Sequence, residues 1–125
     1  MNKILIIDDD HGYRDVVSIA ARKKNWEAYT SPTWRNVQHQ IAEKKFSLII
    51  ADYRLRNETI IELLDYMKRE KIFIPIIVVS ADDDEQYKEK ALDAGATAFY
   101  DKFSLNLSKI GSVKEFSQNG LQALA

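Results

Sequence analysis

The chain has 125 residues, of which 46% are hydrophobic and 30% charged, and its formal net charge is −1. This length allows one domain with a single core, and the composition excludes a disordered or lipid-facing chain. The small net charge gives no overall field that would attract nucleic acid, and the absence of cysteine excludes disulfides, thiolate metal sites and cysteine nucleophiles.

Five apolar segments are predicted to be strands. In chain order they cover residues 3–7, 26–30, 47–51, 74–79 and 97–100. Three of them are unbroken apolar runs, which is typical of central parallel strands covered on both faces. The second segment is more polar and is predicted to lie at an edge of the sheet.

Helices are predicted between these strands because apolar residues recur there at intervals of three and four. In the first and third helices the recurring residues are Tyr13, Val16, Val17 and Ala20, then Ile60, Leu63, Leu64 and Met67. The second helix is predicted to begin with Ser31 as its N-cap and Pro32 at its first helical position. A fourth helix is expected to end before Gly95, and a fifth to cover about residues 105–118. The alternation predicts an α/β fold with a parallel sheet and helices on both faces.

No segment of the sequence predicts membrane insertion or export. The longest apolar run, residues 72–79, is far shorter than the roughly 20 residues that a membrane helix needs. Residues 1–7 contain too few apolar side chains to form the core of a signal peptide. We therefore expect a cytoplasmic protein with no membrane partner and no direct nucleic-acid partner.

Polar residues follow four of the predicted strands. Asp8 and Asp9 follow the first strand, Asp52 the third, Ser80 the fourth and Lys102 the fifth. In an open parallel sheet, ligands bind outside the carboxyl ends of the strands. We therefore expect these five side chains to form one site although they are far apart in the sequence.

Three clustered carboxylates require positive charge. At a separation of 4 Å and an effective dielectric constant near 20, two carboxylates repel by about 4 kcal/mol. Lys102 supplies one positive charge, and the remaining deficit favours Mg²⁺, a hard ion that binds carboxylate oxygens and phosphate together. His11 and His39 are the only imidazoles, so the residues argue against zinc. Asp10 is predicted to cap the first helix instead of binding metal.

This set of groups fits the transfer of a phosphoryl group to a carboxylate. Asp52 would attack phosphorus in line, and Ser80 would donate a hydrogen bond to an equatorial oxygen. Lys102 and the metal ion would neutralise the charge on the transferred group.

Four motifs, ILIIDDD, LIIADYRL, IIVVSADDDEQYKEKALDAGA and FYDK, occur in an order and spacing that resemble the receiver domain of two-component response regulators. The resemblance covers residues 3 to about 118. It implies a single doubly wound, flavodoxin-like domain over residues 1–125, with five helices on both faces of a five-stranded parallel sheet of order 2-1-3-4-5. It also implies a signalling protein, and not an enzyme, that promotes only its own phosphorylation and dephosphorylation.

The resemblance implies a role for each site residue. Mg²⁺ would be held by Asp8, Asp9, Asp52 and the backbone carbonyl of Arg54, with Asp9 in direct contact and Asp8 acting largely through water. Asp52 would accept the phosphoryl group from a sensor histidine kinase or phosphotransfer protein, and Ser80 and Lys102 would bind that group.

The resemblance also implies an output surface. Ser80 and Phe99 would switch together on phosphorylation and change the surface of the fourth helix, fifth strand and fifth helix. A downstream effector protein or domain, or a second copy of the chain in a homodimer, would bind that surface.

Three residues depart from the family pattern. Arg56 and Ile60 stand where the family has proline and glycine, and Phe103 replaces the proline that follows the lysine through a cis bond. A cis bond before a residue other than proline costs about 2.5–4 kcal/mol, so this loop either keeps that bond or takes another path. These departures leave open a pseudo-receiver, a protein-interaction module that phosphorylation does not regulate.

A phosphatase of the haloacid-dehalogenase type is a further alternative. Asp8 and Asp10 follow an apolar strand in a spacing that loosely resembles that family, in which Asp8 would be the nucleophile. The short chain counts against it, and Asp52 would then have no role.

Overall fold

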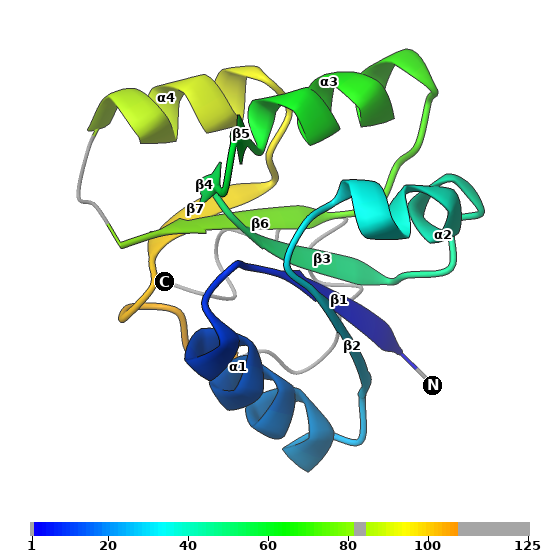
Figure 1. Cartoon of the computed structure of the whole chain (residues 1–125), viewed down its shortest axis with the longest axis vertical. Coiled ribbons are helices and arrows are strands. Elements are labelled where there is room, and N and C mark those ends of the chain that lie inside the picture. The colour runs from blue at the N-terminus through cyan, green and yellow to red at the C-terminus, as the bar shows by residue number, and fades with distance from the viewer. Residues whose placement is uncertain (1, 82–84, 108–125) are drawn as a thin grey trace.

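A five-stranded parallel sheet forms the centre of the structure, a computed structural model that describes residues 2–81 and 85–107 (Figure 1). Its strands are β1 (Lys3–Ile7), β2 (Glu27–Ser31), β3 (Leu48–Asp52), β6 (Ile76–Ser80) and β7 (Ala98–Asp101). Their order across the sheet is β2-β1-β3-β6-β7. Since β6 and β7 are the fourth and fifth strands of this sheet along the chain, the order is the predicted 2-1-3-4-5. The prediction that the second strand lies at an edge is also confirmed.

Helices cover both faces of the sheet. One face carries α1 (His11–Lys23), and the other carries α2 (Gln38–Ala42), α3 (Ile61–Arg69) and α4 (Glu85–Asp93) (Figure 1). This confirms the predicted doubly wound α/β arrangement. Of the fifth helix expected over residues 105–118, residues 108–118 lie outside the described part of the chain. No helix within the described ranges combines the length and the apolar character needed to cross a membrane.

The strands β1, β3 and β6 carry the core. Every residue of β3 and β6 is buried, as are residues 4–7 of β1. One apolar cluster lies beneath α2, α3 and α4 and includes Ile41, Leu63 and Ala91, and a second lies beneath α1 and includes Val17. Burying one Ile or Leu side chain stabilises a fold by about 1.5–3 kcal/mol. The carboxyl ends of these strands are therefore held firmly in place.

The second helix begins later than predicted. Ser31 is the last residue of β2, and the 3₁₀ helix η1 (Arg35–Val37) leads into α2. The Ser31 hydroxyl donates to the Thr33 carbonyl at 2.6 Å and accepts from the Thr33 amide at 3.3 Å. The prediction that Ser31 caps this helix was wrong, because the hydroxyl serves a tight turn instead, the usual alternative for serine.

Asp10 caps α1, as predicted. Its Oδ1 accepts hydrogen bonds from the amides of Gly12 at 2.9 Å and Tyr13 at 3.3 Å. Such a cap typically stabilises a helix by about 1 kcal/mol. It fixes the start of α1 directly after Asp8 and Asp9.

Candidate functional site

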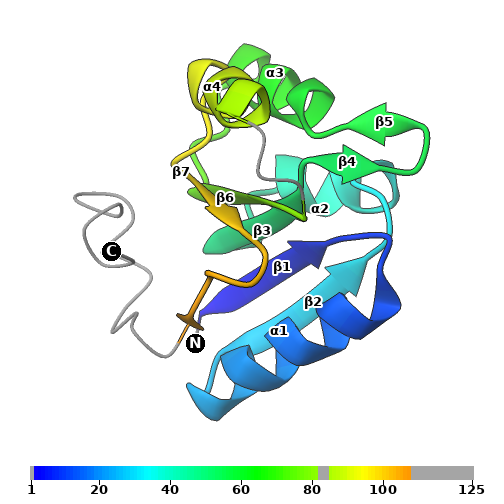
Figure 2. The same ribbon diagram turned by 90° about the vertical axis from the view of Figure 1, so that its left-hand side faces the viewer.

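The parallel strands bring the five predicted site residues to one edge of the sheet. Asp8 and Asp9 follow β1, Asp52 ends β3, Ser80 ends β6 and Lys102 follows β7. The strands end nearly in register, because Asp52 pairs with Val79 and Ser80 with Asp101. The hairpin of β4 (Arg54–Leu55) and β5 (Glu58–Thr59) follows β3 at this edge and leads into α3 (Figure 2).

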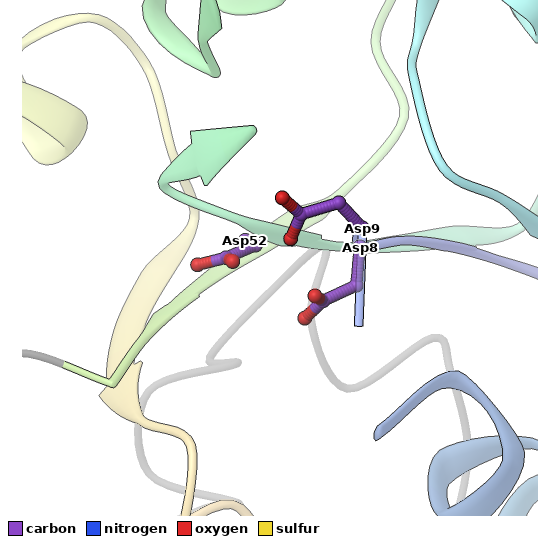
Figure 3. Close-up of side chains that lie close together, drawn as sticks. All are labelled: Asp8, Asp9 and Asp52. Carbon is purple, nitrogen blue, oxygen red and sulfur yellow. The ribbon is translucent and has the colours of Figure 1, made fainter. Parts of the chain in front are cut away.

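Three carboxylates meet at this edge. One oxygen from each of Asp8, Asp9 and Asp52 lies within 4.8 Å of the other two. Their carboxyl groups gather around a common space (Figure 3). Asp8 is completely buried and Asp52 is 8% exposed, whereas Asp9 is exposed to solvent. The predicted convergence of these residues is confirmed, and Asp9 is the member of the cluster most open to solvent.

Lys102 is the positive partner of two of these carboxylates. Its Nζ lies 2.7 Å from Asp8 Oδ2 and 3.2 Å from Asp52 Oδ2. The Lys102 side chain is 9% exposed, so these ion pairs are largely shielded from water. Breaking one partner of such a buried pair is strongly destabilising because it leaves a buried charge uncompensated.

Backbone contacts hold Asp8 in place. Its Oδ1 accepts from the Asp10 amide at 2.9 Å, and its backbone carbonyl accepts from Arg14 Nη1 at 2.6 Å. Both carboxylate oxygens are therefore engaged, one with Asp10 and one with Lys102. These contacts constrain the Asp8 carboxylate, and its expected action on a metal ion through water stays a prediction.

Tyr13, which the sequence placed only on an apolar helix face, belongs to the site. The Lys102 Nζ lies 4.7 Å from the centre of its ring, and its hydroxyl lies 3.4 Å from the Lys102 carbonyl oxygen. Burial, followed by the charges of Asp8 and Asp52, raises the pKa of the Tyr13 hydroxyl. Its position in the first turn after the acids was the one sequence signal that could have indicated this role.

Electrostatics at the site favour a further cation. Burial and then the charge of Asp8 raise the pKa of Asp52 to about 6, although Lys102 lowers it. Burial alone lowers the pKa of Lys102, but its hydrogen bond to Asp8 and the charge of Asp52 outweigh that effect and raise it. Three carboxylates therefore face one ammonium, and all the ligand atoms are oxygens, the donor set that Mg²⁺ prefers. The residues fit this ion.

Ser80, Phe99 and Arg54 occupy the places that the resemblance gave them. Ser80 is 4% exposed, and its carbonyl accepts from the Lys102 amide at 3.0 Å. Phe99 packs against the apolar cluster beneath α2, α3 and α4, whereas its neighbour Tyr100 packs against the cluster beneath α1. Arg54 begins β4, directly beyond Asp52 and the buried Tyr53. Their roles in switching and metal binding stay predictions.

The loop after Lys102 takes another path than the family's cis bond. The described residues contain no cis peptide bond, so Lys102 joins Phe103 in trans. A turn follows, in which the Ser104 amide donates to the Asp101 carbonyl at 2.9 Å and the Phe103 amide to Asp101 Oδ1 at 3.1 Å. The alternative that the sequence left open is thus decided in favour of a trans turn.

The other two departures are accommodated after β3. Arg56 and Asn57 form the turn between β4 and β5, with Asn57 at φ 67°. Asparagine tolerates this left-handed conformation better than most residues. Ile60 is completely buried, and its amide donates to the Tyr53 carbonyl at 2.9 Å. Ile60 therefore supplies core contacts at a position where the family has glycine.

The geometry supports phosphoryl transfer to a carboxylate. Asp52 contacts the ammonium of Lys102 and is clustered with the other two acids, and Ser80 lies on the neighbouring strand. Such a pocket can hold the three equatorial oxygens of a phosphoryl group by charge and hydrogen bonding.

Comparison with known proteins gives the same assignment. The family model of the response regulator receiver domain matches residues 4–110. The phosphate regulon transcriptional regulatory protein PhoB of Pseudomonas aeruginosa is 30% identical over 101 residues, which are 79% of this chain and 44% of that protein. The transcriptional regulatory protein KdpE of Staphylococcus aureus is 32% identical over 81% of this chain and 43% of its own. The chain thus spans less than half the length of these relatives.

Solved structures share the fold. FixJ-N superimposes with a TM-score of 0.81 at 20% identity, covering 95% of each chain. The chemotaxis protein CheY4 of Vibrio cholerae gives a TM-score of 0.75 at 24% identity, covering 100% of this chain and 99% of that one. The sheet order, the acids at its carboxyl edge and the match over residues 4–110 lead to one conclusion: this chain belongs to the response regulator receiver domain family.

Proposed function

We propose that this receiver domain takes a phosphoryl group on Asp52 from a sensor histidine kinase or phosphotransfer protein, with Mg²⁺ bound beside it. The observation that carries the proposal is the position of Asp52, 3.2 Å from Lys102 and clustered with two further acids. In the transfer, an Asp52 oxygen forms a bond to phosphorus while the bond from phosphorus to the donor's imidazole nitrogen breaks. The electron pair of the broken bond stays on that nitrogen.

Each site residue has a part in this reaction. Asp52 is the nucleophile, Lys102 neutralises an oxygen of the transferred group, and the Ser80 hydroxyl donates a hydrogen bond to another oxygen. Asp8 holds Lys102 at 2.7 Å and so keeps the ammonium in reach of Asp52. When bound, Mg²⁺ supplies charge neutralisation at the phosphoryl oxygens.

The residues that would hold Mg²⁺ are Asp8, Asp9, Asp52 and the backbone carbonyl of Arg54. The clustering of the three carboxylates supports this set, and the exposure of Asp9 suits the most direct contact with an ion entering from solvent.

The output of the domain is a change of surface. Ser80 and Phe99 would move together and alter the surface of α4, β7 and the predicted fifth helix, where an effector or a second copy would bind. Phe99 supports this role because it packs against the same core cluster as Ala91 and Tyr87 of α4. A solved neighbour at 22% identity is described as a beryllofluoride-activated NtrC4 receiver domain dimer.

The proposal extends to the whole chain. We infer a single receiver domain over residues 1–125, working in the cytoplasm as a phosphoacceptor that acts catalytically only on itself. The relatives' names describe transcriptional regulators, and this chain matches less than half of each of them.

The decisive experiment locates the phosphoryl group. The chain is incubated with acetyl phosphate and Mg²⁺, and the modified residue is identified by mass spectrometry in wild type, Asp52→Asn and Asp8→Asn. We expect modification of Asp52 in wild type and none in Asp52→Asn. A label on Asp8 that Asp52→Asn leaves intact would instead establish the phosphatase alternative. No label from either a small donor or a cognate kinase, with unchanged partner binding in Asp52→Ala, would establish the pseudo-receiver.

A further inference from the structure

The segment directly after Asp52 is tied to α4 by aromatic and cationic contacts. The rings of Tyr53 and Tyr87 are stacked, with their centres 4.5 Å apart and an angle of 15° between their planes. The guanidinium of Arg54 lies 5.0 Å from the centre of the Tyr87 ring, and its Nη2 donates a hydrogen bond to the Tyr87 hydroxyl. Tyr87 thus contacts two consecutive residues of the site loop at once.

The backbone of Tyr53 belongs to the edge of the sheet that carries the site. Its amide donates to the Val79 carbonyl at 2.8 Å, and its carbonyl accepts from the Ile60 amide at 2.9 Å. The Tyr53 side chain is 4% exposed. Tyr53 is therefore held against β6 directly after Asp52, whereas Tyr87 lies in the first turn of α4.

Arg54 differs from Tyr53 in that its side chain is exposed. Without a partner, an exposed arginine side chain samples many rotamers, although the backbone of Arg54 pairs with Thr59 in the hairpin of β4 and β5. The contact with Tyr87 removes that freedom. The backbone pairing with Thr59 and the side-chain contact with Tyr87 together restrict the conformation of Arg54, and with it the direction of its carbonyl.

We propose that Tyr87 is a positioning residue of the phosphoryl-transfer site. By holding the Tyr53 ring and the Arg54 guanidinium, it orients the Arg54 carbonyl toward the predicted metal position, and this inference rests on the proposed function. Tyr87 acts through Arg54 and does not touch the reacting groups. The contact makes metal occupancy and the placement of α4 interdependent, since a coupling between two sites acts in both directions.

This connection begins at other residues than the one predicted through Ser80 and Phe99, although Tyr53, Tyr87 and Phe99 share one core cluster. It starts at the residues after β3 and not at the end of β6, and it reaches α4 through the buried ring of Tyr53 and the exposed side chain of Arg54. If both connections operate, α4 responds to the phosphoryl oxygens through Ser80 and Phe99, and to the proposed metal ligand Arg54 through Tyr87.

The test measures the Mg²⁺ affinity of several variants without any phosphoryl donor, so that phosphoryl transfer plays no part in the result. Amide chemical shifts are followed by NMR as Mg²⁺ is added to wild type, Tyr87→Leu, Tyr87→Phe and Arg54→Gln. Tyr66→Leu is a matched control, because Tyr66 on α3 also lies between an aromatic ring, Trp34 at 5.6 Å, and an arginine, Arg69 at 5.9 Å.

We expect Tyr87→Leu to bind Mg²⁺ about 3- to 10-fold more weakly than wild type, an effect of the size that a single stacked-ring or cation–π contact gives. Tyr87→Phe keeps the stack and loses only the hydroxyl acceptor, so its affinity should fall between the two. In an Arg54→Gln background, Tyr87→Phe should have no further effect, because the two residues act as a unit. Tyr66→Leu should bind as wild type does.

Two results overturn the inference. One is wild-type Mg²⁺ affinity in a folded Tyr87→Leu, and the other is an equal loss of affinity in Tyr66→Leu. If Tyr87→Leu does not fold, wild-type affinity in both Tyr87→Phe and Arg54→Gln is the overturning result. If wild type itself binds no Mg²⁺ and takes no phosphoryl group, the proposed function has failed and this inference falls with it.

Discussion

The Lys102 ammonium lies closer to Asp8 Oδ2, at 2.7 Å, than to Asp52 Oδ2, at 3.2 Å. Asp8 is completely buried, so this pair compensates a carboxylate that water cannot reach. Lys102 therefore serves the stability of the fold as well as the proposed chemistry of Asp52. The two roles can be separated by measuring stability and phosphorylation in the same variants.

Replacing Lys102 by methionine should destabilise the domain. Removing one partner of a buried ion pair typically costs about 3–5 kcal/mol, and here two carboxylates lose their cation. Urea unfolding at pH 7.5 without Mg²⁺ should show a loss near the lower end of that range, because a methionine side chain still packs. The control Lys88→Met, at an exposed position on α4, should stay within about 0.5 kcal/mol of wild type. Equal stability of the two variants would contradict the structural role of Lys102.

Replacing Asp52 by asparagine should stabilise the metal-free domain at neutral pH. The folded pKa of Asp52, about 6, is raised above its ordinary value of 3.8, so the protonated form favours folding. The stability that this group contributes is full below pH 4 and is lost as the pH rises through 6. At pH 7.5 the ionised group therefore costs about 3 kcal/mol, of which asparagine should recover about 1–3 kcal/mol.

The pH dependence supplies the check on this prediction. Unfolding free energies of wild type and Asp52→Asn, measured without Mg²⁺, should differ most at pH 7.5 and converge toward pH 4. A variant that is less stable than wild type at pH 7.5 would show that the pairing with Lys102 outweighs burial and the repulsion from Asp8.

Magnesium should stabilise the wild-type domain through the same charges. A ligand that binds only the folded state at ten times its dissociation constant adds about 1.4 kcal/mol to the unfolding free energy. Asp9→Asn should lose most of this gain, because it removes a carboxylate from the proposed Mg²⁺ ligands. Since Asp9 is exposed, the substitution leaves the buried ion pair of Asp8 and Lys102 intact. Thermal unfolding with increasing Mg²⁺ measures the effect, and Asp65→Asn on the exposed side of α3 is the control. The same Mg²⁺ response in Asp9→Asn as in wild type would remove Asp9 from the ligand set.

Substitutions should distinguish the helix cap Asp10 from the proposed metal ligand Asp9. Asp10→Ala should lower the unfolding free energy by about 1 kcal/mol, since it removes the cap of α1, and should leave Mg²⁺ affinity unchanged. Asp9→Asn should do the reverse. Urea unfolding and Mg²⁺ titration of both variants give the comparison, and weaker Mg²⁺ binding in Asp10→Ala would show that the cap also orders the metal ligands.

The aromatic ring of Tyr13, and not its hydroxyl, should contribute to stability and to the rate of phosphorylation. Tyr13→Leu removes the surface that covers the Lys102 ammonium at 4.7 Å and should cost about 1 kcal/mol of stability. It should also slow phosphorylation by acetyl phosphate several-fold, because Lys102 gains mobility. Tyr13→Phe keeps the ring and should behave nearly as wild type in both measurements. A defect of equal size in Tyr13→Phe would assign the effect to the hydroxyl near the Lys102 carbonyl.

The sheet and the main site residues could be predicted because both depend on simple patterns. Unbroken apolar runs identified β1, β3 and β6 as buried strands, and the rule for ligand binding at strand ends then brought Asp8, Asp52 and Lys102 together. Ser31 shows where such reasoning ends. A serine hydroxyl can cap a helix or close a turn, and the sequence does not state which of these its neighbours permit.

The contacts of Tyr13 and Tyr87 could not be predicted from periodicity. Tyr13 lies at a helix position that the pattern assigns to packing, and the pattern gave no role to Tyr87. Each meets a charged partner that is distant in the sequence, Lys102 or Arg54. Only the three-dimensional crossing of the chain brings these pairs together. The path after Lys102 was likewise undecided, because the sequence shows only that proline is absent and not which turn replaces it.

The burial of β1, β3 and β6 on both faces has a consequence for how a signal can leave the site. Backbone amides in such strands are expected to exchange with solvent deuterium only when the whole domain unfolds. These three strands are then expected to form the most slowly exchanging unit of the molecule and to resist deformation by charge added at their carboxyl ends. The proposed response to phosphorylation is therefore expected to travel outward, through the loops, the helices and the less buried β7, and not across β1, β3 and β6.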